Sequence, residues 1–142
     1  MIRSDTARCC ERLSAQSANF FEEVAYYDYD GISDDVNEKE LIMEAIGTTN
    51  SVLIMRNHGL CSTGRSVGEA WVKAWYFEKC CKLQMDVLKT QRPYSEISPQ
   101  LLRQAKLSLE TEFPNGMFEW PAILAKWQSQ SGRSQEFIRN RT

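Results

Sequence analysis

The segment from Val52 to Ala70 constrains the fold most strongly, because it places three local signals in succession. Val52 to Met55 is a short apolar run of the kind found in buried strands. Ser66, with Glu69 three residues later, fits a capping box at the start of a helix. The pattern predicts a strand, a turn and then a long helix, with the only histidine of the chain, His58, at the exit of the strand.

The longest expected helix runs from Ser66 to about Thr90. Trp71 and Trp75 widen its apolar stripe, and an apolar face this wide would be buried against both a sheet and a neighbouring helix or subunit. The aromatic residues Trp71, Trp75 and Phe77 are expected in a core or an interface rather than in a ligand site. The stripe itself recurs every three or four positions and consists of Val67, Ala70, Ala74, Phe77, Cys81, Met85 and Leu88.

Shorter elements flank this central pattern on both sides. They are a possible helix between residues 5 and 24, a strand from Tyr26 to Tyr29 with a turn at Asp30-Gly31, a helix from Asn37 to Gly47, and two helices over about 98–112 and 121–128. The resulting order α-β-α-β-α-α-α predicts an α/β fold in which helices pack on a sheet.

Composition narrows the class of protein. The chain has 142 residues, of which 42% are hydrophobic and 25% charged, as expected for a single globular domain. Its 17 basic and 19 acidic residues give a net charge of −2, which argues against binding to nucleic acid. No apolar run approaches the roughly 20 residues of a membrane span. Without a leader-like segment, the cytoplasm is the expected location.

The five cysteines form no C-x-x-C pair, so reduced thiols are expected. His58 and Cys61 have a spacing that could serve a metal, yet a structural zinc needs four ligands and no further donors stand nearby in the sequence. Cys61 is therefore expected to be a small buried apolar residue.

The residues around His58 also carry a resemblance. An apolar strand, then Asn57-His58-Gly59, then Glu69-Ala70 opening a helix that contains Phe77-Glu78, resembles the C-terminal half of the class II aldolase/adducin domain. Upstream, the Tyr-rich segment 24–32 is similar to the adducin-like branch of that family. Downstream, the segment 118–122 is similar to the tail of its bacterial and adducin-related members.

The similarity covers roughly residues 13–128. It implies a domain half over 13–92, followed by a helical extension over 93–142. It also implies the family's three-layer arrangement, in which helices cover both faces of a central sheet. In class II aldolases, the histidine of this motif is one of three that hold a catalytic zinc, which polarises a carbonyl while a glutamate moves the proton.

Carried over residue by residue, the resemblance makes His58 the third zinc ligand. Asn57 and Gly59 match its flanks, and Gly59 and Gly64 would shape the turn. Considered without the family, a lone histidine is more often structural than functional. Only the resemblance reverses that interpretation.

The sequence departs from the family pattern at one decisive point. The other two family ligands form a His-x-His pair, and both they and the acid/base glutamate belong to the N-terminal half of the domain. This chain contains no second histidine, so it cannot assemble a three-histidine site alone. The first hypothesis is therefore a truncated class II aldolase/adducin-like protein, inactive by itself, that does not retain zinc.

Two further hypotheses belong to other functional classes. One is an adducin-like scaffold that has lost its chemistry and associates with the actin cytoskeleton. The other is a zinc-dependent sugar-phosphate aldolase or epimerase whose missing ligands come from another chain. A homo-oligomer or another protein partner is expected under each hypothesis. The substrate is left unassigned, because the segments that would bind it belong to the other half of the family domain.

Overall fold

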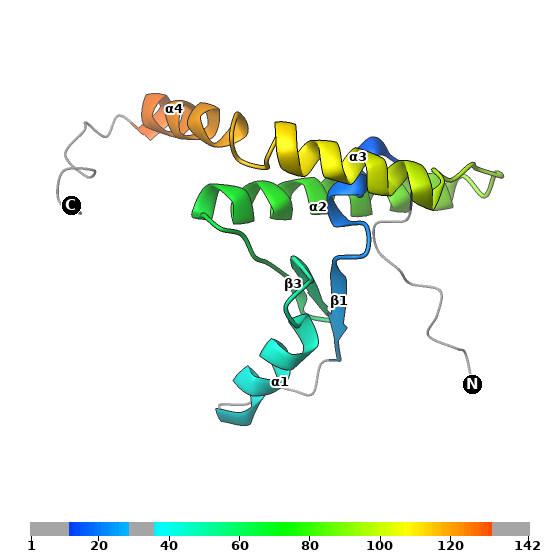
Figure 1. Ribbon diagram of the computed structural model, residues 1–142, viewed down its shortest axis with the longest axis horizontal. Helices are drawn as coiled ribbons and strands as arrows, with labels where there is room; N and C mark the ends of the chain where they lie inside the picture. Colours follow the sequence, from blue (N-terminus) through cyan, green and yellow to red (C-terminus); the bar gives the residue numbers. More distant parts are fainter. Residues whose placement is uncertain (1–11, 29–35, 132–142) are drawn as a thin grey trace.

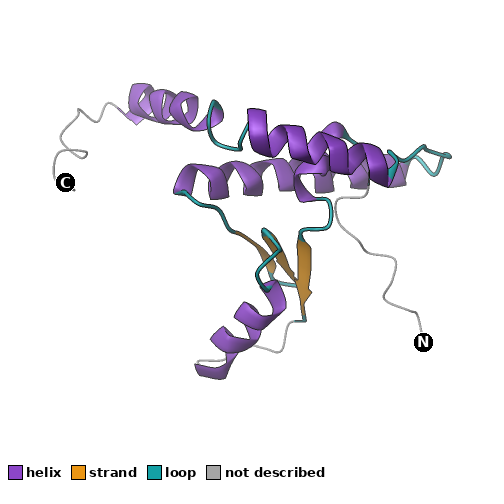
Figure 2. Ribbon diagram, viewed as in Figure 1, coloured by secondary structure: helices purple, strands orange, loops and turns teal. Residues whose placement is uncertain are grey.

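The computed structural model describes residues 12–28 and 36–131. A short 3-10 helix is followed by a three-stranded sheet and four α-helices (Figures 1 and 2). The elements are η2 (Ala15–Phe20), β1 (Val24–Tyr27), α1 (Val36–Ile46), β2 (Val52–Met55), β3 (Gly59–Ser62), α2 (Val67–Lys89), α3 (Pro99–Glu112) and α4 (Glu119–Ser131). The predicted α/β class is confirmed.

The sheet is mixed and has the order β1-β2-β3. β1 and β2 are parallel, with Val24 opposite Val52, and α1 forms the connection between them. β2 and β3 are antiparallel, with Leu53 opposite Cys61. In Figure 1 the sheet lies between α1 and α2, so helices are present on both sides of it.

β3 is absent from the sequence-based prediction, which expected a turn leading directly from Gly59 to the long helix. That expectation is wrong, because β2 and β3 form a hairpin and the turn is confined to three residues. β3 is only four residues long, contains a glycine and is largely exposed. It therefore lacks the alternation of apolar and polar residues that reveals a half-buried strand.

The central core lies between the sheet, η2 and α2. Its buried members are Phe20, Val52, Phe77 and Cys80. The rings of Phe20 and Phe77 meet edge to face, with centroids 5.1 Å apart. This contact fixes η2 against the middle of α2, and the predicted core role of Phe77 is confirmed.

The predicted core stripe of α2 is wrong for much of its length. Val67, Met85 and Leu88 are exposed, at 75%, 54% and 44%, and so lie on the outer side. The buried face consists instead of Gly68, Glu69, Val72, Phe77, Cys80 and Gln84. The periodicity is helical as expected, but the chain carries apolar residues almost all round this helix, so hydrophobicity alone could not select the inner face.

The predicted cap of α2 and the predicted start of α3 near residue 98 are confirmed. The Ser66 side chain accepts a hydrogen bond from the Glu69 backbone amide at 3.1 Å, and Ser98 caps α3 from the residue before Pro99. Gly47 follows α1 with φ of +61°, a conformation that favours glycine. These signals are local, so the sequence located the helix ends well.

The N-terminal helix expected over 5–24 is wrong in its described part, where only η2 forms. The Ser17 hydroxyl donates to the Ser14 carbonyl oxygen at 2.6 Å, a local bond that competes with a regular helix. The next strand begins at Val24 rather than Tyr26, because it aligns with Val52 of β2. The turn expected at Asp30-Gly31 lies outside the described residues.

Close backbone approach holds α4 against the start of α2. A Cβ added at Gly68 would lie 2.6 Å from Cγ of Trp120, and one at Gly116 would lie 2.9 Å from the backbone nitrogen of Glu69. The Tyr76 hydroxyl donates to the Glu119 carboxylate at 3.1 Å. From this contact α4 extends past the N-terminal end of α2 (Figure 1).

None of the helices in residues 12–28 and 36–131 combines the length and the apolar character that a membrane crossing requires.

Candidate functional site

His58 lies in the turn between β2 and β3, together with Arg56 and Asn57. Its backbone amide donates to the Met55 carbonyl oxygen at 3.0 Å and so closes the turn. Asn57 has φ of +60°, a left-handed conformation that asparagine adopts more readily than most residues. The Asn-His-Gly motif therefore has a clear backbone role in this hairpin.

Arg56 connects this turn to the end of β1. Its backbone amide donates to the Tyr27 carbonyl oxygen at 2.9 Å, and its guanidinium forms an ion pair with Asp28. The same guanidinium lies 5.0 Å from the centre of the Tyr26 ring. These contacts hold the hairpin tip beside the parallel strand, with the His58 residue exposed.

The two glycines of the predicted site lie in different surroundings. Gly59 starts β3, and an added Cβ there would meet no atom within 4 Å. Gly64 lies at the other end of β3, where an added Cβ would come within 2.7 Å of the Ala70 backbone nitrogen. Gly64 therefore permits the close packing of the loop on α2. It lies at the end of β3 away from His58, whereas Asn57 and Gly59 are the direct chain neighbours of His58.

The residues present do not fit a zinc site of the kind that the sequence resemblance implies. Within residues 12–28 and 36–131, no three His, Cys, Asp or Glu side chains converge where they could hold a metal ion. Cys61 lies three residues from His58 on the edge strand β3, and it is exposed, so the expectation of a buried Cys61 is wrong. The role of His58 as a metal ligand stays a prediction.

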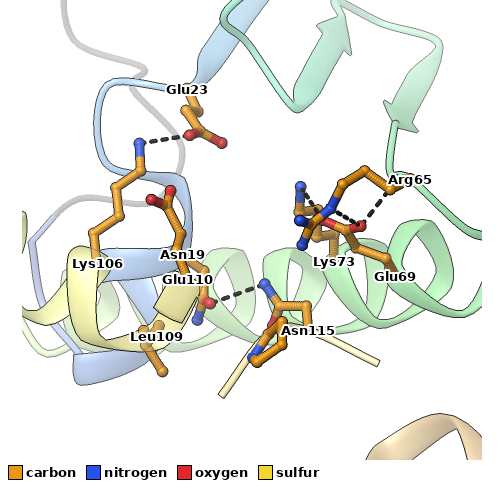
Figure 3. A pocket seen from close by; sticks show the side chains of 10 residues that line it. Asn19, Glu23, Arg65, Glu69, Lys73, Lys106, Leu109, Glu110 and Asn115 are labelled. Carbon is orange, nitrogen blue, oxygen red and sulfur yellow. Dashed lines mark hydrogen bonds and ion pairs between the residues drawn. The ribbon is translucent and has the colours of Figure 1, made fainter. Parts of the chain in front are cut away.

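A charged cavity occupies the opposite end of the sheet from His58. It has a volume of about 210 Å³ and lies where the start of β1, the start of α2 and the end of α3 come together (Figure 3). Its polar and charged lining residues are Asn19, Glu23, Arg65, Glu69, Lys73, Lys106, Glu110 and Asn115. No motif in the sequence marks these residues as a group.

Glu69 is the centre of one side of this cavity. One of its oxygens accepts hydrogen bonds from the backbone amide and the Nε of Arg65, at 2.9 and 3.1 Å, and the other lies 3.1 Å from the Lys73 ammonium. Burial raises the pKa of the Glu69 carboxyl, but these interactions outweigh burial and the pKa lies below its usual value. Glu69 is thus a buried, ionised carboxylate at the N-terminus of α2.

Part of this arrangement had a signal in the sequence. The predicted capping box placed Glu69 near the start of α2, and Lys73 stands four residues later, a spacing at which helical side chains meet. Residues from η2 and α3, such as Asn19 and Lys106, are far away along the chain. No local pattern could have predicted that they share a cavity with Glu69.

Comparison with known proteins gives a consistent result. The family model described as "Class II Aldolase and Adducin N-terminal domain" matches residues 3–85. A Caulobacter vibrioides protein named after class 2 aldolases is 29% identical over 122 residues, which are 84% of this chain and 47% of that protein. Alpha-adducin of Rattus norvegicus is 47% identical over 66 residues, which are 46% of this chain and 9% of the adducin.

The fold agrees with these matches. The crystal structure of an aldolase II superfamily protein from Pseudomonas syringae superimposes with a TM-score of 0.71 at 24% identity, covering 86% of this chain and 49% of the other. The chain therefore spans about half the length of the bacterial relatives and a small part of the adducin. Because the family model covers more than half of the sequence, the chain belongs to the class II aldolase and adducin N-terminal domain family.

Proposed function

We propose that the 142-residue chain is a non-catalytic member of this family that acts in the cytoplasm by binding another protein. One observation supports this proposal above all others. The sequence contains a single histidine, and the described residues bring no second and third metal ligand to it. A catalytic zinc needs three protein ligands and an open position, so one imidazole would leave the ion mostly solvated.

Metal analysis tests the first part of the proposal. Protein purified with zinc and passed through a mild chelator should retain well under one equivalent of metal, measured by mass spectrometry, in the original chain and in His58→Ala alike. Cys61→Ala is the matched control, because it removes the neighbouring soft donor on the same hairpin. One firmly held zinc per chain that disappears in His58→Ala and survives in Cys61→Ala would contradict the proposal.

An activity assay separates this proposal from a composite enzyme. We expect no zinc-dependent cleavage of sugar phosphates by the chain alone, because it has one candidate ligand and no base that matches the family. The alternative is an aldolase or epimerase completed by a second chain. Zinc-dependent turnover that appears only with such a chain, and that His58→Ala abolishes, would favour this alternative.

Exposed aromatic side chains on α2 support the binding role. Val67, Trp71 and Trp75 follow one another at four-residue spacing and remain 75%, 42% and 37% exposed. The two indole rings stack with centroids 6.3 Å apart, and Trp71 also lies 6.3 Å from the ring of Trp120 on α4. We call Val67, Trp71 and Trp75 the tryptophan face.

We propose that the tryptophan face contacts another protein, and that a second copy of this chain is its first candidate partner. Contiguous apolar surface of this kind usually marks a protein interface, and a single patch can pair with itself across a two-fold axis. Analytical ultracentrifugation should show association that Trp71→Ser weakens at least tenfold. Tyr94→Ser is the matched control, since Tyr94 is exposed to a similar degree outside the face. A compact monomer at all concentrations would exclude the self-pairing.

The similarity to alpha-adducin favours a second candidate function. The match reaches 47% identity over 66 residues, well above the 29% found with the bacterial protein. An adducin-like scaffold would associate with the actin cytoskeleton without any chemistry at His58. Co-sedimentation with actin filaments tests this role, and a chain that stays in the supernatant at all filament concentrations would argue against it.

The division of the chain at residues 92 and 93 is also part of the proposal. The family match ends at residue 85, and α3 and α4 form a helical extension beyond the long helix. Limited proteolysis should cut between α2 and α3 first, where residues 90–96 are exposed.

A further inference from the structure

The charged cavity described above is independent of the proposed function, since it lies at the end of the sheet away from His58. One side of the cavity is centred on α2 and the other on α3 (Figure 3). One side carries Arg65, Glu69 and Lys73, from the β3–α2 loop and α2. The other carries Lys106 and Glu110 from α3, with Glu23, the residue before β1, beside them. Each side therefore presents three charged groups to the cavity.

The α2 side has one positive charge in excess, because two cations share the single carboxylate of Glu69. The Nε of Arg65 donates to the Glu69 carboxylate. Among residues 12–28 and 36–131, the two terminal nitrogens of Arg65 make no hydrogen bond. Figure 3 shows this guanidinium directed toward the cavity. Those two nitrogens form an open pair of donors of the kind that binds a carboxylate.

The α3 side has one negative charge in excess. Lys106 forms an ion pair with Glu23 at 2.6 Å and donates to the Phe21 carbonyl oxygen at 2.9 Å. Glu110 lines the same side, and among the described residues it has no hydrogen-bond or ion-pair partner. The carboxylate of Glu110 therefore remains available to a cation inside the cavity.

Two amide side chains complete the lining between the charged sides. The Asn115 side-chain nitrogen donates to the Asn19 side-chain oxygen at 3.0 Å, which links the α3–α4 connection to η2. The second Nδ2–H of Asn115 is left for another acceptor. A volume of about 210 Å³ is below the roughly 300 Å³ at which sites for drug-sized ligands begin. The occupant would therefore be small.

We infer that this cavity binds a small zwitterion of the amino-acid type. Its carboxylate would lie against the terminal nitrogens of Arg65 and the ammonium of Lys73, and its ammonium group would lie against Glu110. A simple anion would be repelled by the unpaired Glu110, and a simple cation by the excess charge beside Arg65. Only a molecule with both charges complements both sides.

Titration of the 142-residue chain with a series of zwitterions tests the inference. The probes are glycine, β-alanine, 4-aminobutyrate and 6-aminohexanoate, which differ only in the separation of their charges, with acetate and ethylammonium as singly charged references. Binding is followed by nitrogen-edited NMR at the side-chain signals of Arg65 and Asn115. For one member of the series, the dissociation constant obtained from these signals should be at least tenfold lower than for acetate or ethylammonium.

Two substitutions assign the binding to the two sides. Glu110→Gln removes the unpaired charge from an exposed position without removing any contact of the fold. It should weaken the binding of the best probe at least tenfold. Glu112→Gln, on the same helix but outside the cavity lining, is the matched control and should bind as the original chain does. Arg65→Lys keeps the charge and loses the paired donors, so it should also weaken binding.

The inference is overturned if no zwitterion binds more tightly than acetate or ethylammonium. It is equally overturned if Glu110→Gln, shown to be folded by its NMR spectrum, binds the best probe as well as Glu112→Gln does.

Discussion

The contact between Gly68 and Trp120 offers a sensitive test of how α4 is attached to the domain. An alanine at position 68 would place its Cβ 2.6 Å from Cγ and 2.9 Å from Cδ1 of the indole. Carbon atoms in contact normally lie about 3.5–4.0 Å apart, so the ring would have to move by about 1 Å. We therefore expect Gly68→Ala to strain or displace the start of α4.

The size of the effect follows from two opposing contributions to the free energy of unfolding. Overpacking in a tight contact costs about 1–3 kcal/mol. Replacing glycine by alanine within a helix stabilises it by up to about 1 kcal/mol. Because Gly68 is in the first turn of α2, the helical gain should be smaller than this limit. The net expectation is a destabilisation of about 1–2 kcal/mol.

Urea unfolding followed by circular dichroism can measure this in a double-mutant cycle. In Trp120→Ala the indole atoms are absent and only the residue-120 Cβ, 3.0 Å from the added Cβ, remains, so Gly68→Ala should cost clearly less in that background. Gly59→Ala is the matched control, because an added Cβ meets nothing within 4 Å there. Equal destabilisation by Gly68→Ala with and without Trp120 would refute the proposed contact.

Three other predictions concern separate parts of the fold. Leu102→Ala should lower the free energy of unfolding by about 2–5 kcal/mol, whereas Leu101→Ala should change it by less than about 1 kcal/mol, because the two side chains are 1% and 54% exposed; urea unfolding decides between them. Glu69 has a lowered pKa, so its stabilising effect is present above the unfolded-state pKa of about 4.3 and is lost as the pH falls through the lower folded-state value. Glu69→Gln should therefore reduce the loss of stability on acidification, and a pH series of melting temperatures that is unchanged by the substitution would contradict this. Asn57→Val should destabilise the hairpin by about 1–2 kcal/mol through its positive φ, and Asn57→Gly should be tolerated, as thermal unfolding can show.

Local signals in the sequence predicted much of the secondary structure. Ser66 and Ser98 marked the starts of α2 and α3, and Gly47 marked the end of α1, because caps depend on hydrogen bonds within a few residues. β3 had no such local signal and was not predicted. Its four residues pair with β2 and carry little pattern of their own.

Features that depend on tertiary packing were less predictable. The inner face of α2 is selected by Phe20 and the sheet, not by the apolar residues of α2 alone. The cavity collects Asn19, Arg65 and Glu110 from three distant segments, so their proximity exists only in the folded chain. His58 was recognised through a family motif, whereas nothing local showed that Asn57 adopts a left-handed conformation beside it.

The mixed pairing of β2 implies an order of events during folding. Its antiparallel neighbour β3 follows after a turn of three residues, so this hairpin can close within microseconds. Its parallel neighbour β1 is separated from it by the whole of α1, and bringing such distant segments together costs more chain entropy. We expect the hairpin and the adjoining part of α2 to form an early nucleus. β1 and η2 would then complete the core around Phe20 and Phe77 only in the final step.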